Sequence, residues 1–195
     1  DIMIDSFREF YIPKQVLEGK VLYKDIFVIY PPLAYLINTF TMKVFGTGFN
    51  VLSLLGLFST MGITYLTYNI TKYFSDSKLN FAICLFLITG LVLSPNVFNS
   101  FFPYSYGILY GVLFALSTLY FVLNKKYPLG YFFCALAILC KYEFLLLLPI
   151  LIFWTKKESL LKNIFYRFFM VEYFFFLSYN IHTLVGLKCM SIMTN

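Results

Sequence analysis

Long apolar stretches separated by short polar segments dominate the chain after residue 46. A helix needs about 20 apolar residues to cross a bilayer, and four stretches approach that length. We interpret them as membrane spans at Phe49–Tyr68, Leu79–Val97, Ser105–Leu123 and Ile164–Leu187. A fifth apolar region, Tyr131–Trp154, is interrupted by charge and needs separate treatment.

The lysines predict the orientation of these spans. Lys72 and Lys78 flank the turn after the first span, and Lys125 and Lys126 follow the third. The connection Ser94–Tyr104 carries no charge. Because cytoplasmic loops carry an excess of Lys and Arg, we place the lysine-bearing turns in the cytoplasm. The uncharged connection and the N-terminal segment are then external.

The fifth apolar region is predicted to be broken. A single crossing would carry Lys156 and Lys157 to the external side, against the lysine bias. Two limbs meeting near Lys141-Tyr142-Glu143 would instead return the chain to the cytoplasm. Each limb would have about 13 residues and a length of roughly 20 Å, too short to cross. Such a pair is tolerated only where protein buries it or where it lines a watery cavity.

The polar N-terminal segment predicts a first helix. Ser6 and Glu9 have the spacing of a capping box, so we expect the helix to start at Phe7. A bend or restart is expected at Pro13, because proline lacks the amide hydrogen. Gly19 is expected to end the helix.

A second helix is predicted from Pro31–Pro32 to Phe45, ahead of Gly46. One face of it is apolar, as in helices that lie in the membrane interface. That face comprises Leu33, Leu36, Ile37, Phe40 and Val44. An extended Val21–Tyr30 link would join the two helices and hold Asp5 and Asp25 at the external membrane surface.

Composition supports an integral membrane protein. The chain is 61% hydrophobic, 22% aromatic and only 12% charged, with a mean hydropathy of +0.80, far from the mix typical of soluble domains. We predict an all-α polytopic transmembrane bundle forming a single partial membrane domain over residues 1–195. The net charge of +6 lies in short clusters between apolar runs, which argues against a nucleic-acid partner. The chain begins with Asp1 rather than methionine, so we expect a fragment.

The order of these features resembles a known family. An acid before a helix, the pattern G-x-x-x-Y-x-D, then P-P-L and a helix ending in F-G resemble the first external loop of the GT-C glycosyltransferase superfamily. Similarity is greatest to the group with the protein O-mannosyltransferases (family 39), the aminoarabinose transferases of lipid A and the Rgt-type galacturonosyltransferases. It spans Asp5–Trp154 and includes the segment Lys141–Pro149. The matching loop residues are Asp5, Arg8, Glu9, Gly19, Tyr23, Asp25, Pro31, Pro32, Leu33 and Gly46.

The resemblance implies an enzyme. It implies transfer of a sugar from a polyprenyl-phosphate carrier to a hydroxyl of a glycan, lipid or protein, with inversion of the anomeric centre. The implied location is the bacterial inner membrane, with the active loop on the periplasmic face. Neither a cofactor nor a metal ion is expected. Cys84, Cys134 and Cys140 lie in apolar segments without metal-type spacing.

The resemblance also implies residue roles. Asp5 occupies the place of the loop acid that deprotonates the acceptor, and Asp25 resembles a second acid that orients a base or acceptor. The lipid-phosphate leaving group needs cations, for which Arg8 and Lys141 are the candidates. Ser94–Tyr104 lacks the acid that some relatives carry there.

Structural alternatives remain for each candidate. Asp5 can favour a helix dipole, Asp25 can pair with a nearby lysine, and Glu9 can serve as the capping partner. Lys141 can reach the membrane surface or pair with Glu143. For the whole protein, the alternatives are a transporter or lipid flippase, since broken helices also form substrate pathways, and a non-catalytic membrane scaffold.

Overall fold

The computed structural model describes the backbone of residues 2–93, 103 and 105–155, with side chains outside 2–6 and 91–93. This part of the chain is helical and contains no strand, so the predicted all-α class is confirmed for it. The helices are α1 (Ile2–Leu17), α2 (Leu33–Phe45), α3 (Phe49–Thr71), α4 (Ser77–Leu93), α5 (Tyr106–Leu123), α6 (Tyr127–Cys140) and α7 (Leu147–Thr155), with the 3₁₀ helix η1 (Tyr142–Leu146) before α7.

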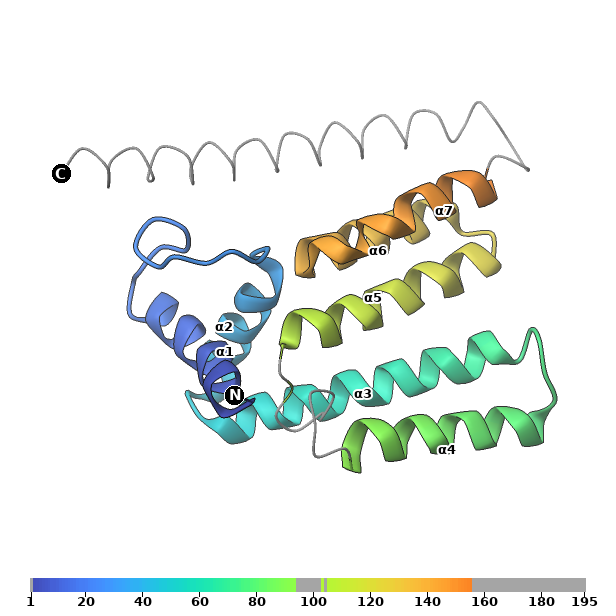
Figure 1. The fold of residues 1–195 in the computed structure, drawn as a ribbon, viewed down its shortest axis with the longest axis horizontal. Coiled ribbons are helices and arrows are strands. Elements are labelled where there is room, and N and C mark those ends of the chain that lie inside the picture. The colour runs from blue at the N-terminus through green and yellow to red at the C-terminus, as the bar shows by residue number, and fades with distance from the viewer. Residues whose placement is uncertain (1, 94–102, 104, 156–195) are drawn as a thin grey trace.

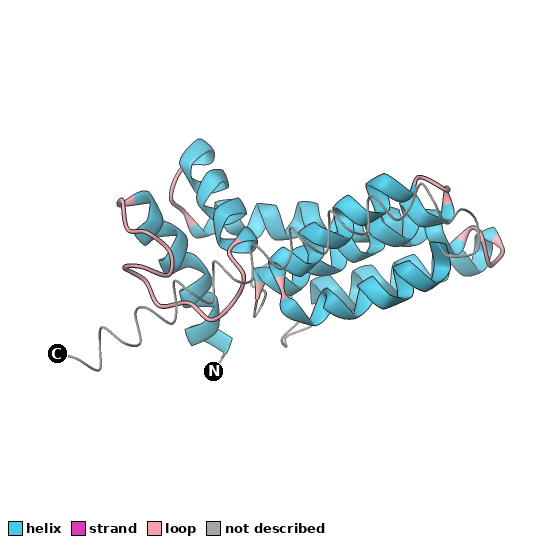
Figure 2. Ribbon diagram, turned by 90° about the horizontal axis from the view of Figure 1, so that it is seen from above, coloured by secondary structure: helices cyan, strands magenta, loops and turns pink. Residues whose placement is uncertain are grey.

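Helices α3 to α7 lie side by side along one long axis (Figure 1). Within this bundle α5 packs between α3 and α6, and α4 packs against the other side of α3. Helices α1 and α2 pack on each other at one end of the bundle (Figure 2). Because α2 also contacts α3, α5 and α6, it joins the terminal pair to the bundle.

Two of the predicted spans are helices long and apolar enough to cross a membrane. They are α3 and α5, whose lengths are about 35 Å and 27 Å at 1.5 Å per residue. The predicted span Leu79–Val97 is described as far as the end of α4. The predicted span Ile164–Leu187 lies outside the described residues.

The predicted break in the fifth apolar region is confirmed. Helix α6 ends at Cys140, and Lys141 is extended with φ −158° and ψ 135°. The chain then reverses through η1 into α7. The hydroxyl groups of Tyr131 and Thr155 are 2.9 Å apart, which pairs the start of α6 with the end of α7. Tyr131–Trp154 is therefore a helical hairpin rather than one straight crossing.

The predicted start of the first helix is wrong. Helix α1 already begins at Ile2 and continues through Pro13, so Ser6 and Glu9 lie inside the helix and cannot form a capping box. The same three-residue spacing that suits a cap also fits neighbouring positions on a helix face. The predicted end at Gly19 holds, because the amide groups of Gly19 and Lys20 donate to the carbonyls of Val16 and Gln15, as in a Schellman motif.

The second helix agrees with its prediction. Pro32 caps the N-terminus of α2, and Gly46 follows the helix at φ 95°, a conformation that favours glycine. The predicted apolar face is only partly free, since Leu33 and Ile37 are half-buried against the hydrophobic core. Leu36, Phe40 and Val44 are exposed.

The link between α1 and α2 is less extended than predicted. Its first part is a closed turn, in which the Tyr23 amide donates to the Ile26 carbonyl at 3.0 Å. Tyr23 adopts φ 66°, a left-handed conformation that is uncommon for a residue other than glycine. The turn directs Val28 into a small core with Ile12 and Tyr35.

Small residues allow α2, α5 and α6 to approach closely. A Cβ atom added to Gly107 in α5 would lie 2.9 Å from the Cys140 carbonyl oxygen and 3.8 Å from the Ala34 Cβ. Gly107, Ala34 and Cys140 thus form a three-helix junction. It belongs to the largest buried core, which also includes Met42 and Tyr110.

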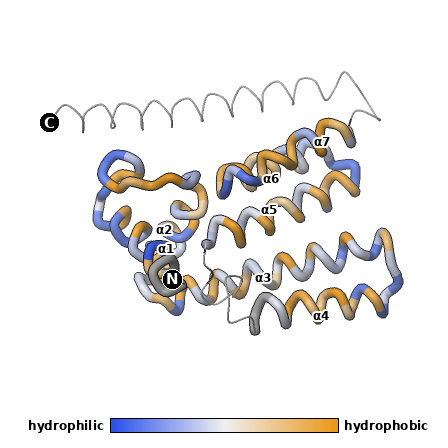
Figure 3. The backbone as a smooth tube through the Cα atoms, in the orientation of Figure 1, coloured by the Kyte–Doolittle hydropathy of each residue, from blue (hydrophilic) through white to orange (hydrophobic). Residues whose placement is uncertain are grey.

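The outer surface of the bundle is apolar. Exposed large side chains occur on α3, α4 and α7, including Phe58, Phe86 and Phe153. Hydrophilic residues gather at the turns and in the first part of the α1–α2 link (Figure 3). A soluble monomer seldom exposes apolar surface on this scale.

The Gly107 junction yields a stability prediction. Gly107→Ala should lower the thermal midpoint in detergent, because the new methyl group meets a backbone carbonyl that cannot rotate away. Overpacking of this kind costs about 1–3 kcal/mol. Gly90→Ala is the matched control, since an added Cβ there meets nothing within 4 Å. Equal midpoints for the two variants would contradict this account of the junction.

Candidate functional site

The predicted phosphate-binding cations meet at one aromatic ring. The guanidinium carbon of Arg8 lies 5.3 Å from the centroid of the Tyr30 ring. The ammonium group of Lys141 lies 5.9 Å from the same centroid. Both distances are within the range of cation–π contacts. The fold therefore brings together two cations from α1 and the α6–η1 break that are remote in sequence.

Hydrogen bonding fixes the position of Tyr30. The Tyr23 hydroxyl donates to the Tyr30 carbonyl oxygen at 2.7 Å, and Pro31 and Pro32 restrict the backbone that follows. Burial raises the pKa of the Tyr23 phenol, and Tyr142 and Tyr35 raise that pKa further. The Tyr23 phenol therefore stays protonated and able to donate at neutral pH.

A buried carboxyl group lies beside Arg8. Glu9 on α1 is only 1% exposed, and its Oε1 is 3.7 Å from Nη2 of Arg8. Burial raises the pKa of Tyr35 on α2, Glu9 raises it further, and Arg8 opposes that shift. Arg8, Glu9 and Tyr35 thus form one electrostatic cluster between α1 and α2.

A buried hydrogen bond joins α2 to α5. The Tyr110 hydroxyl donates to Oδ1 of Asn38 at 2.6 Å, where both groups are buried. A hydrogen bond between two buried polar groups restricts how their helices can shift, because separating them leaves both unsatisfied. This bond fixes α2 relative to α5.

Lys141 has a second partner. Its ammonium group lies 2.9 Å from Oε1 of Glu143, so the alternative expected from the sequence, a local ion pair, is present. The Glu143 side chain is 65% exposed, whereas the Lys141 side chain is 17% exposed. Lys141 is therefore enclosed between Tyr30 and a carboxylate that faces solvent.

The break that presents Lys141 has its own packing support. The ring of Phe144 in η1 occupies the space beside Gly111 of α5, where an added Cβ would overlap it at 2.0 Å. The Lys141 carbonyl accepts a bond from the Phe144 amide at 3.2 Å. This bond closes the first turn of η1.

Asp25 has a local role in the structure. Its Oδ2 accepts a hydrogen bond from the Val21 amide at 2.8 Å, and the Asp25 side chain is exposed. Such a bond is typical of an aspartate that closes a turn. The structure thus places Asp25 in the turn that positions Tyr23.

Asp5 belongs to α1 by its backbone, about one turn before Arg8 and Glu9, and its side chain lies outside the described part. The predicted external connection Ser94–Tyr104 also lies outside it, apart from Pro103. The start of α5 that follows this connection packs near α2. The described flank of the connection is therefore at the same end of the bundle as α1 and α2.

Several site residues were not identified from sequence. The sequence assigns Tyr30 to the link, Tyr35 and Asn38 to the second helix, and Tyr106 and Tyr110 to a span, without a role in the site. A signal was present in α2, where Ala34, Asn38 and Met42 repeat every four residues, all buried. An asparagine on an otherwise apolar helix face needs a polar partner when it is buried.

The arrangement suits an anionic group. Arg8 and Lys141 supply positive charge, and phenolic hydroxyl groups beside them can donate hydrogen bonds. Within the described residues, no group of three or more His, Cys, Asp or Glu side chains could hold a metal ion. Comparison with protein-family models, curated proteins and solved structures returned no match.

The Tyr23 hydrogen bond yields a prediction about the link. Tyr23→Phe should weaken the closed turn by about 1 kcal/mol, the usual contribution of one hydrogen bond. Trypsin should then cut at the exposed Lys20 and Lys24 about fivefold faster at neutral pH, measured by peptide mass analysis. Tyr11→Phe is the control, because Tyr11 is exposed on α1. An unchanged cleavage rate would contradict the role assigned to the Tyr23 phenol.

Proposed function

We propose that the protein is a polytopic membrane glycosyltransferase of the GT-C type. In this proposal it transfers a sugar from a polyprenyl-phosphate carrier to a hydroxyl acceptor on the external face. The observation that carries the proposal is the meeting of Arg8 and Lys141 at Tyr30. A lipid-phosphate leaving group requires such a pair of cations at the membrane surface.

The apolar exterior supports the membrane part of the proposal. Helices α3 and α5 have the length and composition of membrane spans, and exposed aromatic side chains surround the bundle. The described polar cluster is instead confined to the end where α1 and α2 lie. The lysines Lys72, Lys78, Lys125 and Lys126 are exposed at the opposite turns. By the positive-inside rule the opposite end is cytoplasmic and the cluster is external.

The proposed reaction uses each cluster member differently. Arg8 and Lys141 bind the donor phosphate and stabilise the charge that grows on it as the glycosidic bond breaks. Asp5 accepts the proton of the acceptor hydroxyl as that oxygen attacks the anomeric carbon. Glu9 and Tyr35 orient the Arg8 guanidinium, and Tyr23 holds Tyr30 beneath both cations. Asp25 supports the reaction indirectly, through the turn that carries Tyr23.

The catalytic test uses the three acids near the site. Asp5→Asn should reduce turnover by about 10²-fold or more, because the amide cannot accept the proton. Asp25→Asn should reduce it less, since it changes only a turn contact. The measurement is transfer of radiolabelled sugar from a polyprenyl-phosphate donor in membranes. Near-normal turnover with Asp5→Asn would eliminate that base. Glu9→Gln is the comparison for a buried acid whose charge orients Arg8.

The donor-binding test determines whether Lys141 binds the donor phosphate or serves only as the ion-pair partner of Glu143. Lys141→Gln should weaken donor binding by about tenfold, the loss of one charge-assisted bond. Glu143→Gln should strengthen donor binding, because its carboxylate competes for the same ammonium group at 2.9 Å. Binding is measured with a non-transferable donor analogue, alongside thermal midpoints. If both variants lose stability equally and keep donor affinity, Lys141 serves only as a structural partner of Glu143.

A further inference from the structure

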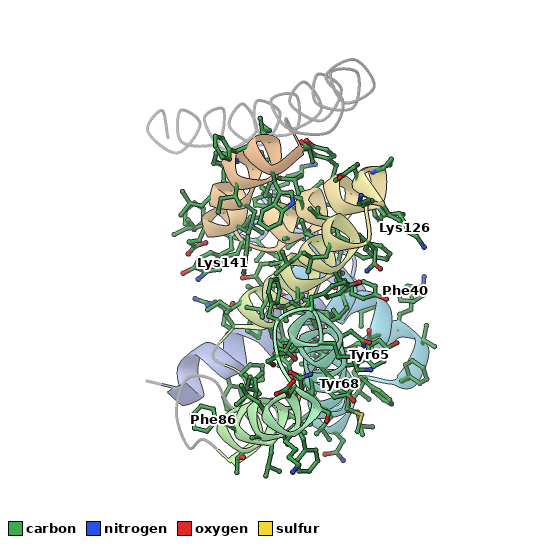
Figure 4. The ribbon with its side chains drawn as sticks, turned by 90° about the vertical axis from the view of Figure 1, so that its right-hand side faces the viewer. Phe40, Tyr65, Tyr68, Phe86, Lys126 and Lys141 are labelled. Atoms are coloured by element: carbon green, nitrogen blue, oxygen red, sulfur yellow. The ribbon has the colours of Figure 1, made fainter. Side chains whose placement is uncertain are left out.

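A second surface feature lies away from the Tyr30 site. A groove of about 480 Å³ runs between α3 and α4. Tyr65 and Tyr68 of α3 line it, and both are labelled in Figure 4. Cys84 and Ile88 of α4 line it as well. It is open to the outside of the bundle, where Tyr65 is 65% exposed.

The threonine hydroxyl groups in the groove wall are already bonded within the protein. The Thr60 hydroxyl donates to the Gly56 carbonyl at 3.0 Å, and the Thr64 hydroxyl donates to the Thr60 carbonyl at 2.9 Å. The Cys84 thiol lies 3.9 Å from the Thr64 carbonyl oxygen. A polar ligand would find few groups to bind here, so the groove fits an apolar chain.

A positive charge lies at one end of the groove. The Lys72 ammonium group is 4.4 Å from the centroid of the Tyr68 ring, and Lys72 follows the last residue of α3. None of the described acids forms an ion pair with it. An apolar channel that ends at an exposed cation is complementary to an amphiphile with an anionic headgroup.

We propose that the α3–α4 groove binds an acyl chain of an anionic phospholipid, with the headgroup phosphate at Lys72. This proposal rests on the membrane location proposed above and is independent of catalysis. The polyprenyl-phosphate donor is a poor candidate for this groove. The start of α3 at Phe49 stacks on Phe10 of α1, so Lys72 lies at the far end of a helix about 35 Å long.

The test uses tryptophan fluorescence and brominated lipids. Trp154 is the only tryptophan of the chain. A variant with Trp154→Phe and Tyr65→Trp therefore carries a single reporter inside the groove. It is reconstituted in phosphatidylcholine vesicles that contain increasing fractions of brominated phosphatidylglycerol or brominated phosphatidylcholine. We expect half-maximal quenching at about a fivefold lower fraction of the anionic lipid, the preference that one surface lysine provides.

Two lysine variants test whether Lys72 produces the preference for the anionic lipid. Lys72→Gln in the reporter protein should abolish the preference for the anionic lipid. Lys43→Gln is the matched control, because Lys43 is an exposed lysine in the last turn of α2. It should leave the preference unchanged. A preference that survives Lys72→Gln would overturn the proposal, as would equal quenching by the two lipids.

The native tryptophan provides an internal control. Trp154 borders a different groove, between α5 and α7, so its quenching reports whether lipid reaches the apolar surface of the bundle. Quenching of Trp154 without quenching at position 65 would show that protein covers the α3–α4 groove, and would overturn the proposal while leaving the membrane location intact. Ile88→Trp in the Trp154→Phe background is the second reporter if Tyr65→Trp does not fold.

Discussion

The close approach of α2 to α5 and α6 determines where Tyr30 and Lys141 lie. It requires Gly107, because a side chain there would meet the Cys140 carbonyl. The Asn38–Tyr110 hydrogen bond then sets how α2 lies on α5. Since Tyr30 directly precedes the Pro31–Pro32 start of α2, its ring is carried to the break after Cys140. Lys141 reaches that ring only because both sides of the junction are close.

Burial of charge explains why the cluster is so interconnected. A carboxyl group that is almost fully buried, as Glu9 is, is costly unless hydrogen bonds and opposite charge surround it. Arg8 supplies the charge and Tyr35 supplies a buried phenol. Removing one of these three side chains would leave the other two buried without that partner. The orientation of Arg8 toward Tyr30 is therefore coupled to the packing of α1 on α2.

Sequence patterns predicted the elements better than the site. The length of apolar runs identified α3 and α5, and the position of the charged residues near Lys141 identified the α6–α7 hairpin. The capping-box prediction failed because Ser6 and Glu9 have a spacing that is common both at helix ends and within helices. Tyr30, Asn38 and Tyr110 could not be assigned because their roles depend on which helices meet. That information resides in glycines and other small residues, whose effect appears only in three dimensions.

The break at Lys141 presents a cation at the end of α6. An interrupted helix leaves amide and carbonyl groups that need partners where water is scarce. Here the Lys141 carbonyl accepts a bond from the Phe144 amide, and the Phe144 ring fills the space beside Gly111. A continuous α6–α7 helix would carry Glu143 away from Lys141 and Lys141 away from Tyr30. The geometry of the polar cluster thus depends on an aromatic ring and a glycine that carry no charge.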